Sequence, residues 1–146
     1  MSDLHTLFGG IAVGVNALAA AIGAVAWLAN RNPKLFWIAL RAGQVLVGIS
    51  VVIGAVLLLD GRDLPRLHLV YGLTPVAVAF LAEQLKLLAT QTLLDKRGYE
   101  CGADIAKLPE AEQRAFVTAV LRRELGVMAT SAFVVAVLAA RAQLWL

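Results

Sequence analysis

The sequence has little of the charge that keeps a soluble protein in water. Only 16% of its 146 residues are charged and 60% are hydrophobic, whereas soluble domains typically have about 25% charged and 45–50% apolar residues. The mean hydropathy is +0.79. Because one membrane span takes about 20 apolar residues, a chain of this length has room for four spans. The composition therefore excludes a soluble enzyme domain, a disordered tail and a multidomain protein.

Cysteine is almost absent, and the usual catalytic motifs are missing. Cys101 stands alone, which excludes a disulfide within the chain and any CxxC redox or zinc motif. No phosphate loop, nucleophile elbow or paired-carboxylate site is present. The net charge is +3, but the long polar connection is mixed in charge and Tyr99 is its only well-exposed aromatic residue, so a nucleic-acid role has no support. The start of the chain carries Asp3 in place of a basic segment, which favours a retained first helix over a signal peptide.

Four apolar runs are separated by residues that end or begin helices. Pro33 follows the first run, and Pro65 suits the first turn of the third helix. The third helix becomes amphipathic after Ala82, and Gly98 can end it. We predict an all-α integral membrane four-helix bundle with an amphipathic connection between its third and fourth helices. The whole chain, 1–146, forms one domain with spans at about 4–29, 35–59, 66–88 and 122–143.

The basic residues are distributed unevenly between the two ends of such a bundle. If both termini lie on one side, that side holds 3 of the 13 basic residues, Arg62, Arg66 and Arg141. The opposite side holds the other ten, Arg31, Lys34, Arg41, Lys86, Lys96, Arg97, Lys107, Arg114, Arg122 and Arg123. The positive-inside rule then places both termini outside the cell, in a bacterial cytoplasmic membrane. Trp27 and Trp37 fall at the inner interface and Trp145 at the outer one, as in an aromatic belt.

The two histidines are the first candidates for a cofactor site. His5 opens the first helix and His68 opens the third, so both side chains are expected at the same depth near the outer boundary. Ligands for a shared cofactor in a four-helix bundle come from facing helices, and a low-spin haem takes two axial ligands. Gly72, one turn below His68, would leave room for a flat macrocycle. The alternative is that each histidine is only a polar residue at a wet helix end.

Three arginines lie on the histidine side, where haem propionates would emerge. Arg62, Arg66 and Arg141 could bind these carboxylates through their guanidinium groups. Alternatively, Arg62 and Arg66 pair with Asp60 and Asp63, and Arg141 reaches lipid headgroups. A zinc or copper site made from both histidines and these two carboxylates is a further alternative.

Part of the chain, about residues 5–80, resembles one half of a haem A synthase. The residues that carry this resemblance are Gln44-x3-Gly48 and Gly54 on one apolar helix, followed by a short polar loop and His68. In that family a QxxLG helix lies between two helices that bear axial histidines. The resemblance implies that His5 and His68 are the axial pair of a haem b, with Gln44 and Gly48 on the intervening helix.

The chain departs from that family in ways that do not support its hydroxylation of a haem methyl group. Val47 stands where the motif has leucine, only one half-repeat is present, and no arginine follows His5. The chain also resembles small four-span bacterial membrane proteins whose third helix begins with histidine-x-x-tyrosine-glycine, here His68, Tyr71 and Gly72. That group has no assigned activity.

Two further features concern packing. Arg41 and Glu83 are expected to pair near the inner boundary. Small residues of the first helix share one face that suits close contact with a helix of this chain or of another copy: Gly10, Gly14, Ala17, Ala21 and Ala24.

Three functions are compatible with the sequence. The first is a small membrane b-type cytochrome or haem-binding subunit for electron transfer or haem handling, without independent catalytic activity. The second is a cofactor-free accessory or assembly subunit of a larger membrane complex. The third is a small oligomeric transporter or channel, which the lack of charge in mid-membrane disfavours. The expected partners are the lipid bilayer and either a homo-oligomer or a larger membrane redox complex.

Overall fold

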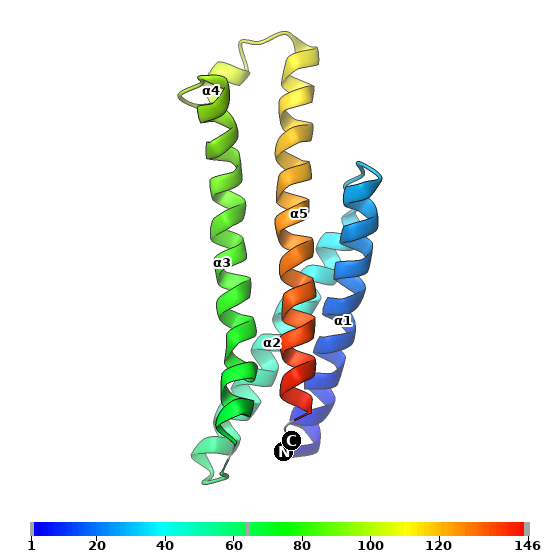
Figure 1. Cartoon of the computed structure of the whole chain (residues 1–146), viewed down its shortest axis with the longest axis vertical. Coiled ribbons are helices and arrows are strands. Elements are labelled where there is room, and N and C mark those ends of the chain that lie inside the picture. The colour runs from blue at the N-terminus through cyan, green and yellow to red at the C-terminus, as the bar shows by residue number, and fades with distance from the viewer. Residues whose placement is uncertain (1, 64, 145–146) are drawn as a thin grey trace.

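The computed structural model describes residues 2–63 and 65–144, and all regular structure in these ranges is helical. The helices are α1 (Ser2–Leu28), α2 (Lys34–Leu59), α3 (Arg66–Arg97), the short α4 (Gly102–Ile105) and α5 (Glu110–Gln143). Figure 1 shows that α1 begins and α5 ends at the same end of the molecule, beside the connection from α2 to α3. Trp145 lies outside the described residues.

Three of the four long helices, α1, α2 and α3, end beside a residue in a left-handed conformation. Gly61 and Gly98 have φ values of 81° and 72°, and Asn30 has a φ of 51°. At each of the three positions, two backbone N–H groups bind carbonyls of the preceding helical turn, as in a Schellman motif. Proline is the residue before α2, α3 and α5. The helix ends therefore follow from local backbone chemistry.

The four long helices form a ring with one loosely packed side. α1 packs along α2 and along α5, and α5 packs along α3, whereas α2 and α3 touch only sparsely. α1 and α3 thus lie diagonally across the bundle. The core is thin and rich in alanine, with Phe36, Leu40, Leu125 and Met128 as its largest fully buried apolar side chains apart from a proline.

The outer surface of the bundle is apolar. Exposed side chains include Leu18, Val25, Val52 and Phe80. Four of the described helices are long and apolar enough to cross a membrane. An apolar outside around a small core is typical of a protein that contacts lipid, and the fold indicates an integral membrane protein.

α3 and α5 are longer than the spans 66–88 and 122–143. As expected, α3 continues to the residue before Gly98. The helix that begins after Pro109 is not a separate element, because it runs without a break into the fourth span. Together these segments project beyond the connection between α1 and α2 (Figure 1). Leu94, Ile105 and Phe116 form a small core of their own between them.

Candidate functional site

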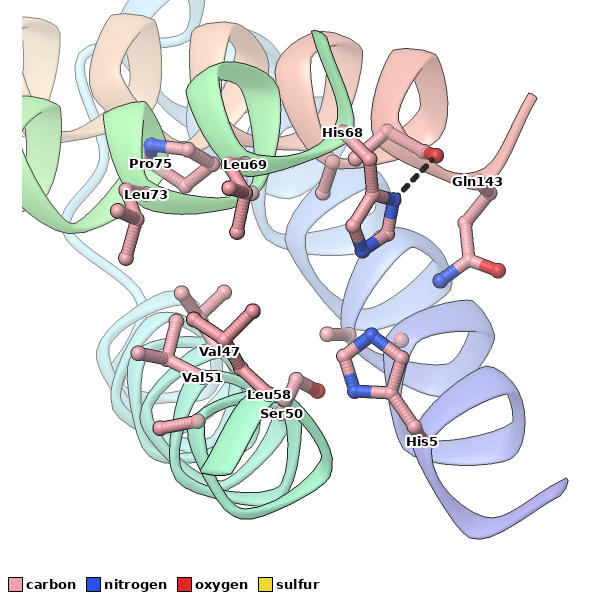
Figure 2. A pocket seen from close by; sticks show the side chains of 17 residues that line it. His5, Val47, Ser50, Val51, Leu58, His68, Leu69, Leu73, Pro75 and Gln143 are labelled. Atoms are coloured by element: carbon pink, nitrogen blue, oxygen red, sulfur yellow. Dashed lines mark hydrogen bonds between the residues drawn. The ribbon is translucent and has the colours of Figure 1, made fainter. Parts of the chain in front are cut away.

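The structure brings the two histidines together inside the bundle. His5 near the start of α1 and His68 near the start of α3 have ring centroids 5.7 Å apart, with the ring planes 67° from parallel. Figure 2 shows that a nitrogen of each ring points toward the other ring. His68 is buried, with 6% of its surface exposed. The two imidazoles therefore meet across the diagonal of the bundle.

His68 is oriented by the end of α5. Its Nδ1 lies 3.1 Å from the carbonyl oxygen of Ala142. Because a carbonyl only accepts hydrogen bonds, Nδ1 is assigned as the N–H donor, and Nε2 is left with an unprotonated lone pair. Metal-binding histidines have the same arrangement, in which a backbone carbonyl fixes the tautomer and the ring orientation.

His5 is held against α2 by a glycine. A Cβ at Gly54 would lie 3.1 Å from Cε1 of His5. Nδ1 of His5 is buried without a hydrogen-bond partner. It faces the backbone of Ser50, although no hydrogen bond of normal geometry forms between them. The ring thus lies against α2, and its other nitrogen faces His68 (Figure 2).

An apolar cavity of about 230 Å³ adjoins the imidazole pair. Most of its wall comes from the facing sides of α2 and α3, and α1 and the last turns of α5 complete it. Leu58 and Val51 of α2 lie opposite Leu69 and Leu73 of α3, as Figure 2 shows. The cavity is smaller than the 300–1,000 Å³ of typical sites for drug-sized ligands. A larger ligand would have to widen the side between α2 and α3, which is the least packed side of the bundle.

Some of the predicted site residues lie at this cavity and others do not. Gly72 lines it together with the two histidines. Gln44 and Gly48 do not line it. Nε2 of Gln44 instead binds Oε1 of Glu83 at 3.2 Å, and Gly48 has open space around its Cα. Gln44 and Gly48 therefore lie on α2 outside the lining of this cavity, and their role in binding a cofactor stays a prediction.

The three arginines of the same end have different surroundings. Arg62 and Arg66 are exposed, and within the described residues neither forms an ion pair with Asp60 or Asp63. The guanidinium of Arg141 lies 5.9 Å from the ring centre of Tyr71, a cation–π contact. All three arginines therefore lie at the end of the bundle that bears the imidazoles.

The alternative metal site is not formed. Among residues 2–63 and 65–144, no three side chains of histidine, cysteine, aspartate or glutamate gather in one place. Asp60 and Asp63 therefore do not join the histidines, and any metal held here would have only the two imidazoles as protein ligands of these types.

The pairing of Arg41 with Glu83 is confirmed, and it joins α2 to α3. The guanidinium of Arg41 binds the carboxylate of Glu83 and, at 2.6 Å, Oε1 of Gln44. Nζ of Lys86 lies 4.0 Å from the same carboxylate. This polar cluster lies on the loosely packed side of the bundle, between α2 and α3. The cavity separates it from the connection between these two helices.

Two contributors to the site had no signal in the sequence. The carbonyl of Ala142 is a main-chain group, so its residue type says nothing about its role. The side-chain amide of Gln143 fills the space next to Gly9, and a Cβ on Gly9 would overlap this amide. The side chain of Gln143 also lies beside both imidazoles (Figure 2). From the sequence one could expect only that the end of α5 lies at the same end of the bundle as the two histidines.

Comparison of the chain with known protein families, with curated proteins and with solved structures finds no match. The case for a function therefore depends on the geometry of the imidazole pair and its cavity.

Proposed function

We propose that this protein is a small membrane b-type cytochrome or haem-binding subunit, with His5 and His68 as the axial ligands. The observation that carries the proposal is the pair of imidazoles that face each other from diagonal helices beside an apolar cavity.

The separation of the rings supports a shared metal. An imidazole nitrogen binds a first-row metal at about 2.0–2.1 Å, and the ring centre lies about 1.1–1.2 Å behind that nitrogen, which puts the centres of two opposed imidazoles about 6.4 Å apart. The observed distance is 5.7 Å, so the two rings would separate by roughly 0.7 Å to hold a metal between them. A metal cation between the two facing nitrogens would accept a lone pair from each neutral imidazole.

The surroundings favour haem over a bare ion. Within residues 2–63 and 65–144 only two such protein ligands come together, whereas structural metal ions usually take four. A porphyrin supplies the remaining four donors and an apolar face that suits the leucines and valines of the cavity wall. With Cys101 as the only cysteine, attachment through a pair of cysteines is excluded, so the group would be a non-covalent haem b.

The charge distribution gives the proposed orientation. The end that bears the histidines also bears Arg62, Arg66 and Arg141, which could neutralise propionates at the mouth of the bundle. The opposite end bears most of the remaining basic residues and would face the cytoplasm of a bacterial cell. A haem near the outer surface would serve electron transfer or haem handling across that boundary.

The test is titration of the purified protein with haem, followed by absorption spectroscopy. We expect a Soret band that shifts on reduction, and a stoichiometry of one haem per chain. His68→Ala and His5→Ala should each abolish the six-coordinate spectrum. Thr74→Val is the matched control on α3, because Thr74 is half-buried but does not line the cavity, and its hydroxyl donates to the carbonyl of Val70.

Two outcomes would overturn the proposal. A protein that stays colourless with added haem would favour the accessory or assembly subunit. A haem spectrum that survives both histidine substitutions would show that any haem binds elsewhere. Ion or solute flux in liposomes, together with a colourless protein, would favour the transporter or channel.

A further inference from the structure

A groove runs along the outside of the bundle between α1 and α5, away from the histidines. Its volume is about 810 Å³. Small side chains form most of its floor, and Trp27 and Phe133 stand at its edges. Residues that represent the two walls are Ala17, Ala21 and Ala24 of α1 and Gly126, Thr130 and Val137 of α5. Three alanines of the small-residue face predicted for α1, Ala17, Ala21 and Ala24, therefore line this outer groove.

The groove is long enough for a lipid chain. On α1 its lining extends from Val13 to Trp27, which at 1.5 Å per residue is about 21 Å. Half of the hydrocarbon core of a bilayer measures about 15 Å. The groove is therefore long enough for an acyl chain to lie in it from the headgroup to the middle of the bilayer.

Positive charge gathers at the Trp27 end of the groove. The guanidinium of Arg122 lies 5.4 Å from the ring centre of Trp27. Arg123 is exposed beside it, and Arg31 is exposed in the connection that follows α1. Glu124 is the only acidic residue within this part of α5, so the charge at this end is positive. Arginine binds phosphate through two parallel hydrogen bonds.

We infer that the groove between α1 and α5 is a binding site for an anionic phospholipid, with one acyl chain along the alanines and the headgroup phosphate at Arg122. The charge at its end favours this occupant over a second copy of the chain. A two-fold contact between two such grooves with parallel chains would bring the arginines of both copies together, and like charges oppose that contact. The site is independent of the haem proposal, because none of its residues lines the cavity next to the histidines.

The experiment uses fluorescence of Trp27 in vesicles of phosphatidylcholine. Trp37→Phe and Trp145→Phe leave Trp27 as the only tryptophan, and brominated lipids quench it on contact. At equal mole fractions, brominated phosphatidylglycerol should associate about fivefold more strongly than brominated phosphatidylcholine, the effect expected for one arginine near an anionic headgroup. Arg122→Gln should remove this preference. Arg114→Gln, on the projecting part of the same helix, is the matched control and should keep it.

A second pair of variants tests the acyl chain. Ala24→Leu narrows the groove and should reduce quenching by both lipids, whereas Ala42→Leu, at an exposed alanine of α2 outside the groove, should not. Equal quenching by the two lipids, or a preference that survives Arg122→Gln, would overturn the inference. An Ala24→Cys variant tests for a second copy in the groove. A disulfide between two copies of this variant, together with a loss of quenching by lipid, would assign the groove to a second copy and overturn the inference.

Discussion

A methyl group at Gly54 is the sharpest probe of the imidazole pair. A Cβ there would lie 3.1 Å from Cε1 of His5, whereas carbon atoms pack best at about 3.5–4.0 Å. The imidazole must therefore move by roughly 0.4–0.9 Å in a Gly54→Ala variant. That movement is a large fraction of a metal–nitrogen bond of about 2.0–2.1 Å, so the axial bond from His5 should weaken or break.

Gly48→Ala is the matched control for this variant. Both glycines lie on α2, and a Cβ at Gly48 would meet nothing within 4 Å. The gain in helix propensity on replacing glycine by alanine, about 1 kcal/mol, applies to both variants and cancels in the comparison. We expect Gly54→Ala to lower haem affinity by about 10- to 100-fold, as changes in groups that orient a metal ligand do.

The assay is haem titration followed by absorption, which reports affinity and spin state together. Gly54→Ala should shift the bound haem toward a five-coordinate, high-spin spectrum, and Gly48→Ala should retain the parent spectrum. Identical affinities and spectra for the two variants would refute the assignment of His5 as an axial ligand held against α2.

Three further predictions concern the bundle and its polar connection. Glu83→Gln removes the ion pair that joins α2 to α3 and should lower the free energy of unfolding by about 1 kcal/mol; an unchanged thermal midpoint would contradict this. Gly23→Ala places a Cβ 2.6 Å from two core side chains and should cost about 1–3 kcal/mol, whereas Gly14→Ala, which meets open space on the same helix, should gain about 1 kcal/mol of helix propensity in the same unfolding assay. Hydrogen bonds from Lys107 and from the backbone lower the pKa of Asp104, so these contacts stabilise the short helix above the ordinary carboxylate pKa and are lost as pH falls through the lowered value. An NMR titration should show this pKa returning toward its ordinary value in Lys107→Gln, and no change would count against the contact.

The sequence predicted the helices well because their ends are local features. Proline before a helix and glycine or asparagine after one act through the backbone of a few residues. The meeting of His5 and His68 followed from the same logic, because both residues open helices that run in the same direction. The depth of a residue in the membrane can be estimated by counting residues from the start of its helix.

Positions around the helix axis were harder to predict. Gln44 and Val47 are three residues apart and share a face of α2, but only Val47 lines the cavity. Gln44 lies one turn further from the histidines and meets Glu83 instead. Likewise, the contact between His68 and the carbonyl of Ala142 depends on the rotation of α5, which only the packing of the whole bundle determines.

The central claim is that both imidazoles bind one iron, and electron paramagnetic resonance of the oxidised protein with haem tests it most directly. We expect a low-spin ferric signal typical of two imidazole ligands, which His5→Ala and His68→Ala should each convert to a high-spin signal. A ferric signal that is high-spin in the parent protein, or that neither substitution changes, would contradict it.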